Sequence, residues 1–176
     1  MTAAVAAAPV GSMAPSLARR MASLVYEGLI LFGIGLIPGA IGALFTALTG
    51  HQHPLQSDTA LRLITFLIFG VYFTWFWSAR GQTLPMQTWR IRVVTDAGEA
   101  LSQRRALLRY LASCAWFAPA ALVAHLNGWS GARGLAAIGV GIVIYALLAL
   151  LHPRHQFWHD ALCRTQLVDA GRVGTR

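Results

Sequence analysis

The stretch GLILFGIGLIPGAIGALFTALTG, residues 28–50, contains no charged side chain. A helix of this length rises about 1.5 Å per residue and reaches roughly 35 Å, enough to cross a bilayer with some tilt. Three further uncharged stretches come close to the length of a spanning helix. We therefore predict an all-α membrane protein, a bundle of four transmembrane helices near residues 24–48, 63–79, 110–127 and 134–151.

The composition supports this class. Of the 176 residues, 56% are hydrophobic and only 11% are charged, against about 25% charged in an average soluble domain. The alternative is a soluble all-helical core, but four unbroken apolar runs in so short a chain leave no polar face for water.

The arginines predict the orientation of the bundle. All 14 basic residues are arginine and the formal net charge is +8. They flank the apolar runs instead of forming a stripe, so we expect no nucleic-acid partner. Twelve fall on one side of the predicted bundle, and only Arg62 and Arg133 fall on the other. By the positive-inside rule, both termini are expected on the cytoplasmic side.

The chain ends are expected to lie outside the membrane domain. Residues 1–15 are rich in Ala and Pro and lack the basic start of a cleavable signal peptide, which predicts a disordered tail. The membrane domain is expected over residues 16–169, and residues 170–176 form a C-terminal tail.

The predicted cytoplasmic loop, residues 80–109, is more than a connector. Residues 89–94 alternate in the manner of a strand, and residues 95–98 form a turn signal, so we predict a short hairpin there. Ser102 can cap an amphipathic helix that leads into the third span. Five arginines of this loop are expected to face anionic lipid headgroups or a protein partner: Arg90, Arg92, Arg104, Arg105 and Arg109.

Three blocks of the chain, taken in order, resemble the RDD family of bacterial membrane proteins. They are ARRMASLVYEG at 18–28; GQTL at 81–84 with RIRVV at 90–94 and RRALLR at 104–109; and WHDAL at 158–162 with Thr165. The resemblance covers roughly residues 16–169. It implies a multi-pass protein of the bacterial inner membrane, with a possible homo-oligomer or membrane protein partner.

The resemblance also implies the charged signature residues. The family arginine falls on Arg20, with Arg19 as an alternative, and the last aspartate falls on Asp160. The first aspartate falls on Glu27, which keeps the charge and adds a methylene. The chain departs from the family in the loop, where Pro85-Met86-Gln87 replaces the common glycine and basic residue.

Arg20 and Glu27 lie seven positions apart, so on a helix they share one face and are separated by roughly 10 Å along the axis. This is too far for an easy direct ion pair. A buried carboxylate and a buried guanidinium each need a partner, and we predict that Asp160 approaches the first helix near Arg20. Two roles stay open: a structural clamp, or a path for ions or protons, since ionisable residues inside a membrane are functional by default.

His152, His155 and His159 have helical spacing beside Asp160 and form the only other cluster with ligand chemistry. No cysteine completes a ligand set, so an interfacial surface is the stronger interpretation, and we expect no metal and no cofactor. The chain has no glycine-rich phosphate loop, zinc-protease pattern or nucleophile elbow. We therefore expect no enzyme.

Two main functions remain from sequence alone. The first is transport of ions or small solutes, which predicts a polar cavity that reaches Glu27. The second is an accessory or scaffold role, in which the arginine-rich loop binds a partner or anionic lipid. A metal-binding membrane protein is a third, and it predicts convergence of His155, His159 and Asp160.

Overall fold

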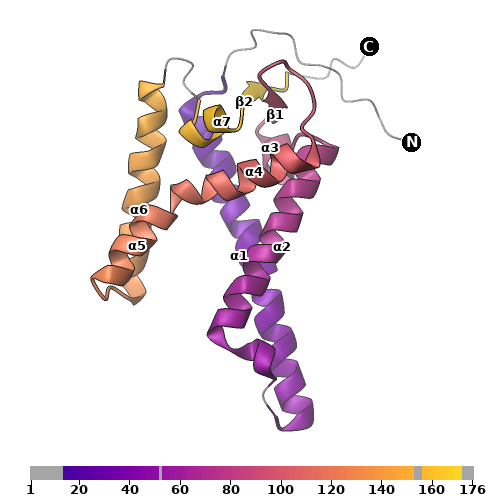
Figure 1. The fold of residues 1–176 in the computed structure, drawn as a ribbon, viewed down its shortest axis with the longest axis vertical. Coiled ribbons are helices and arrows are strands. Elements are labelled where there is room, and N and C mark those ends of the chain that lie inside the picture. The colour runs from indigo at the N-terminus through magenta and orange to yellow at the C-terminus, as the bar shows by residue number, and fades with distance from the viewer. Residues whose placement is uncertain (1–13, 52, 153–155, 172–176) are drawn as a thin grey trace.

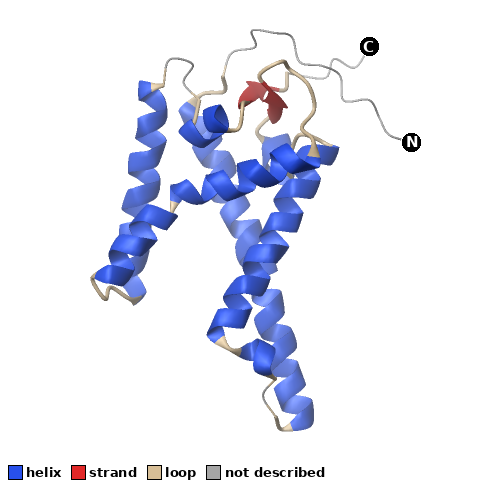
Figure 2. Ribbon diagram, viewed as in Figure 1, coloured by secondary structure: helices blue, strands red, loops and turns tan. Residues whose placement is uncertain are grey.

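The computed structural model describes residues 14–51, 53–152 and 156–171 and is mostly helical (Figures 1 and 2). Its elements, in chain order, are α1 Leu17–Thr49, η1 Pro54–Gln56, α2 Asp58–Ala79, α3 Leu84–Thr88, β1 Ile91–Thr95, α4 Gln103–Ser113, η2 Cys114–Trp116, α5 Ala118–Leu126, α6 Gly131–Leu148, η3 Ala149–Leu151, α7 Trp158–Leu162 and β2 Thr165–Asp169. The predicted tail at residues 1–15 falls almost wholly outside the described residues, as does most of the tail at 170–176.

Helices α1 and α2 form a hairpin that gives the molecule its long axis (Figure 1). The Ser16 side chain accepts from the Arg19 backbone N–H and starts α1, and Gly50 ends it in the left-handed conformation with φ 71°. At the far end, the Gln56 amide donates to the Gly42 carbonyl and to Thr46, which fastens the connecting turn to α1. The two predicted spans at 24–48 and 63–79 lie within these helices.

The third predicted span, residues 110–127, is broken. Ser102 caps α4 as expected, but α4 ends at Ser113, and the axis of α4 with η2 meets that of α5 at a bend of 43°. In Figure 1, α4 runs across the direction of α1 and α2. The nine residues of α5 rise only about 14 Å, so α5 alone is too short to cross a bilayer. The bend replaces the single straight helix that composition predicted.

Helices α5 and α6 form a second hairpin, which stands apart from the first in Figure 1. Its contact is very close at one point, because a Cβ added at Gly141 would lie 2.5 Å from the Cβ of Ala120. Small residues that let helix backbones approach are the usual means of packing helices in lipid, where no hydrophobic force drives them together.

The two strands that pair come from segments far apart in the sequence. β1 pairs antiparallel with β2 in a two-stranded sheet, with Val93 opposite Leu167. The local hairpin predicted within residues 80–109 is therefore wrong. Gly98, with φ 80°, does close a turn onto the Thr95 carbonyl, but the chain then leaves for α4 instead of returning as a strand. The partner strand comes from beyond α7.

The segment around α3 and β1 is repeated at a constant spacing of 74 residues. The helix at 84–88 corresponds to the helix at 158–162, and the strand at 91–95 corresponds to the strand at 165–169. Each strand is preceded by an arginine in the left-handed region, Arg90 with φ 53° and Arg164 with φ 52°. Each unit follows a long apolar helix, α2 or α6. The antiparallel pairing of two such units is what a pseudo-twofold arrangement produces.

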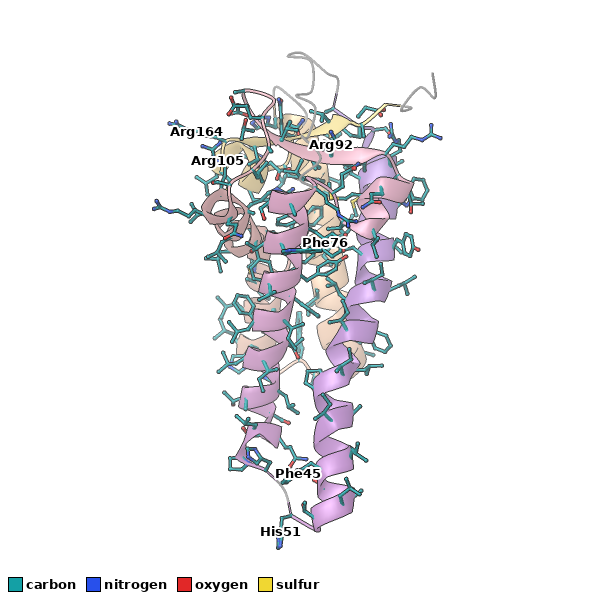
Figure 3. The ribbon with its side chains drawn as sticks, turned by 90° about the vertical axis from the view of Figure 1, so that its right-hand side faces the viewer. Phe45, His51, Phe76, Arg92, Arg105 and Arg164 are labelled. Atoms are coloured by element: carbon teal, nitrogen blue, oxygen red, sulfur yellow. The ribbon has the colours of Figure 1, made fainter. Side chains whose placement is uncertain are left out.

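The helical hairpins expose apolar side chains over most of their length. Leu29, Leu48 and Leu135, for example, are 67%, 77% and 72% exposed. Three described helices are long and apolar enough to cross a membrane, or four if the bent α4–α5 pair counts as one span. Figure 3 shows labelled arginines 92, 105 and 164 at one end of the molecule and His51 at the other. This surface is that of a membrane protein, not of a soluble helical core.

Candidate functional site

Glu27 is buried within α1 and binds two hydroxyl groups. Tyr72 of α2 donates to its Oε1 at 2.7 Å, and Thr83 donates to its Oε2 at 2.5 Å. Thr83 is also the N-cap of α3, so the carboxylate joins α1 to the start of the short helix. No arginine of the described chain forms an ion pair with Glu27. Its partners are neutral oxygens.

Arg20 lies two turns earlier on the same helix and is 5% exposed. Its guanidinium carbon lies 4.6 Å from the centroid of the Phe157 ring, a cation–π contact with the segment that precedes α7. Its Nε and Nη1 atoms are buried and have no hydrogen-bond partner in the described chain. Arg20 therefore carries a buried charge that the described side chains satisfy only in part.

Asp160 is fully buried, and its partner is Arg109 of α4. The Arg109 Nη2 lies 2.7 Å from the Asp160 Oδ1, and the Arg109 guanidinium also lies 4.1 Å from the centroid of the Trp77 ring. These contacts join α7, α4 and α2 at the end of the molecule that carries the strands. A buried pair of this kind costs desolvation, so it specifies the arrangement of the elements more than it stabilises them.

His159 completes this polar cluster. Its Nε2 lies 3.3 Å from the Asp160 carboxylate and its Nδ1 lies 3.0 Å from the Tyr145 hydroxyl, which also accepts from the His159 backbone N–H. Burial lowers the pKa of His159 to about 4, although Asp160 acts in the opposite direction and Arg109 adds to the lowering. The imidazole is neutral at pH 7.

Arg20, Glu27 and Arg109 reach a cavity of about 460 Å³ between α1, α2, α4 and α6. Arg20, Glu27 and Arg109 contribute its charged lining, and most of the rest is apolar or aromatic. A volume in this range is typical of pockets that hold small ligands. The site is thus a partly open apolar cavity with two guanidiniums and one carboxylate in its walls.

Comparison with known proteins identifies the family. The model of the RDD family matches residues 14–164. The chain belongs to the RDD family. No curated protein and no solved structure matches it. The family resemblance noted in the sequence is therefore confirmed. The matched range includes Arg20, Glu27 and Asp160, the residues to which the sequence resemblance assigned the charged signature.

The prediction that Asp160 approaches α1 near Arg20 is confirmed only in part. Asp160 lies near enough to Arg20 to interact electrostatically, but its ion pair within the described chain is with Arg109. The link between the tail and α1 is instead the Phe157 ring against Arg20. Asp160 faces α4 because α7 packs there, which the spacing of charges along the chain does not reveal.

Arg109 was also predicted to belong to the lipid-facing or partner-facing loop, and this is wrong, since it is 5% exposed and paired. The other four arginines of that set, Arg90, Arg92, Arg104 and Arg105, are exposed or half-buried. Arg105 and Arg109 share one face of α4, but Arg109 lies one turn further along the helix, where Asp160 of α7 and Trp77 of α2 contact it.

Arg19, the alternative signature position, has a separate role. It forms an ion pair with Asp169 at 2.5 Å and donates to the carbonyls of Trp89 and Arg90. Hydrogen bonding from Arg19 holds the pKa of Asp169 below its usual range. This contact joins the start of α1 to both strands and shows that the two ends of the described chain lie at the same face.

The histidine cluster is tested only in part, because His155 lies outside the described residues. His152 packs edge-on against Trp158, whereas His159 points to Tyr145 and Asp160. Within residues 14–51, 53–152 and 156–171, no three His, Cys, Asp or Glu side chains converge on a position for a metal ion.

Sequence reasoning missed the partners of Glu27. Tyr72 lies within the predicted span 63–79, and Thr83 lies in the block GQTL at 81–84; neither pattern indicates a contact with Glu27. One signal was present: Thr83 lies just before Leu84-Pro85, and a threonine followed by proline at the first turn is a typical helix start. A hydroxyl at such a cap is held in place and can donate a hydrogen bond to a neighbouring carboxylate.

Proposed function

We propose that this RDD protein contributes to the movement of protons or small cations across the membrane, with Glu27 as the group that binds them. The observation that carries the proposal is the environment of Glu27. Its carboxylate lines a cavity in the membrane-spanning region, and its described partners are the hydroxyls of Tyr72 and Thr83. Ionisable groups at such positions are rare and mark ion or proton pathways.

The chemistry of these three side chains suits an exchangeable cation. Both hydroxyls donate to the carboxylate in the structure, and a hydroxyl also has lone pairs that accept. If Glu27 binds a proton, its carboxyl O–H can donate a hydrogen bond to Thr83 or Tyr72 once that hydroxyl rotates. If it binds a hard cation, carboxylate and hydroxyl oxygens are suitable ligands. An arginine in direct contact would instead lock the carboxylate in its charged state.

The repeated architecture also supports transport. Two units of similar build, α2–α3–β1 and α6–α7–β2, lie beside each other with their strands antiparallel. In membrane transporters with repeats of this kind, binding sites lie between the repeats. Here the cavity takes lining residues from both units, among them Phe69 and Ile142.

The test is ion flux in liposomes that contain the purified protein, under imposed proton, sodium and potassium gradients. We expect flux in the parent protein and its loss in Glu27→Gln. Glu99→Gln, which removes the same charge from an exposed loop position, is the matched control and is expected to retain flux. Absence of flux in the parent, or equal flux in a correctly folded Glu27→Gln, would contradict the proposal.

A second function is favoured by a different observation. Arg92, Arg105 and Arg164 lie at one end of the molecule (Figure 3), where they could bind an acidic partner or anionic lipid in an accessory or scaffold role. This role requires no ion flux. Substitution of Arg104 and Arg105 by glutamine would then weaken association of the partner, whereas Glu27→Gln would leave it unchanged.

We further propose that the protein lies in a bacterial inner membrane with four crossings and both termini in the cytoplasm. The excess of arginine at the strand-bearing end and the Arg19–Asp169 contact support this orientation. In a variant whose Cys114 and Cys163 are serine, a cysteine at Glu99 should react with an impermeant thiol reagent only from the cytoplasmic side. A cysteine at Ser57 should react only from the other side.

A further inference from the structure

The cavity beside α1 has an unsatisfied charge at one end. The Nε and Nη1 of Arg20 are buried and lack a hydrogen-bond partner in the described chain, and Arg20 lines the cavity. The neighbouring acids are already occupied, because Asp160 pairs with Arg109 and Glu27 accepts from Tyr72 and Thr83. A guanidinium removed from water is costly until an anion meets it.

Most of the walls that lead away from Arg20 are apolar. Leu24 and Leu31 line the cavity from α1, Phe66 and Phe69 line it from α2, and Ile142 lines it from α6. From Arg20 to Leu31 the helix rises about 16 Å. Glu27 interrupts this wall, but its carboxylate already accepts from Tyr72 and Thr83, and the apolar side chains around it match an aliphatic chain.

Gly28 has no side chain to occupy this part of the cavity. Gly28 lines the cavity, and a Cβ added there would meet no atom within 4 Å. The α6 helix reaches the cavity through Ile142, which lines it opposite α1.

We propose that this cavity binds a membrane amphiphile with an anionic headgroup. The anion would lie against the Arg20 guanidinium and the aliphatic chain would lie along α1 past Leu24 and Leu31. The ligand chemistry, a negative head on an apolar chain, complements the Arg20 guanidinium at the end of a mostly apolar cavity, because the second guanidinium in the walls, Arg109, is already paired with Asp160. This inference goes beyond ion movement and does not depend on it.

The test counts lipids on delipidated protein by native mass spectrometry. Phosphatidylglycerol and phosphatidylcholine with identical chains serve as anionic and zwitterionic probes, and inorganic phosphate serves as the free anion. We expect phosphatidylglycerol to bind at least tenfold more tightly than phosphatidylcholine, and phosphate alone to leave it bound. Displacement by phosphate, or equal binding of both lipids, would overturn the proposal.

Two pairs of variants locate the site. Arg20→Gln is expected to weaken phosphatidylglycerol binding at least tenfold, whereas Arg104→Gln, which removes the same charge from an exposed position, should leave it unchanged. A second variant leaves Arg20 in place and so separates lipid binding from any effect of Arg20 on folding. Gly28→Leu fills the cavity, and Gly39→Leu is its control, since a Cβ at Gly39 also meets no atom within 4 Å.

Gly28→Leu should lose the lipid and Gly39→Leu should keep it. Unchanged binding in Gly28→Leu would overturn the proposal. If Arg104→Gln weakened phosphatidylglycerol binding as much as Arg20→Gln, the headgroup would bind at the exposed loop, and the proposal would be overturned as well. A dimer that carries no lipid would show that a second copy of the chain fills the cavity. These results concern lipid binding in the absence of any gradient, so they are independent of the flux experiment.

Discussion

The carboxylate of Asp160 and the guanidinium of Arg109 lie 2.7 Å apart, both buried, and join the short helix α7 to α4. Asp160 forms its ion pair with Arg109 and not with Arg20. This pair also stands between the two repeated units, because α4 precedes the second unit and packs on α2 of the first.

Asp160→Asn should lower the free energy of unfolding by about 3–5 kcal/mol, because it leaves the Arg109 charge buried without a carboxylate. Unfolding in mixed micelles of increasing denaturing detergent measures the change. Asp58→Asn, at an exposed position in the first turn of α2, is the control and should cost less than about 1 kcal/mol. Adding Arg109→Gln to Asp160→Asn should recover part of the loss. A cost no larger than that of the control would mean that the pair contributes nothing to the fold.

The pH dependence of stability should contain a contribution from His159. Its pKa is lowered to about 4 in the folded protein, against about 6.5 in the unfolded chain. Between these values the unfolded state binds more protons, so stability rises with pH through this window and is level above it. His159→Asn should reduce the dependence between pH 4 and 6.5, as followed by unfolding at several pH values. An unchanged slope in that variant would assign the dependence to other groups.

Gly141→Leu should separate the α5–α6 hairpin. A Cβ at Gly141 would meet the Ala120 Cβ at 2.5 Å, whereas a Cβ at Gly139 would meet nothing within 4 Å. Overpacking of this kind costs about 1–3 kcal/mol or more, so Gly141→Leu should lower the unfolding midpoint and Gly139→Leu should not. The distance between spin labels on α5 and α6 provides a second measurement. Equal midpoints for the two variants would rule out the close approach of the helices.

Gln156 should matter more than its repeat counterpart Gln82. The Gln156 amide, 5% exposed, both donates to and accepts from the Leu167 backbone at 3.0 Å, whereas Gln82 donates once, to the Ile91 carbonyl. Gln156→Ala leaves two buried backbone groups unpaired and should cost about 2–4 kcal/mol, against about 1 kcal/mol for Gln82→Ala. Hydrogen exchange at the Leu167 amide should be faster only in Gln156→Ala. Similar exchange in both variants would contradict this difference.

The repeat illustrates what sequence patterns conceal. The matched positions Gln82 with Gln156 and Arg90 with Arg164 are visible at a spacing of 74 residues, yet the surrounding residues differ, and Thr83 corresponds to Phe157. In the first repeat the Thr83 hydroxyl donates to Glu27. In the second repeat the Phe157 ring forms a cation–π contact with Arg20. The backbone arrangement is repeated while the side chains that reach α1 are specialised.

The sequence by itself determined the membrane class, the helices around residues 24–48, 63–79 and 134–151, the Ser102 cap and membership of the RDD family. These follow from local causes, since the length of an apolar run and the chemistry of a cap act within a few residues. Only the tertiary structure decided the partner of β1, the bend between α4 and α5, and the contacts of Glu27 and Asp160. These depend on which distant surfaces meet, and a buried charge accepts whichever partner the packing of the helices brings within reach.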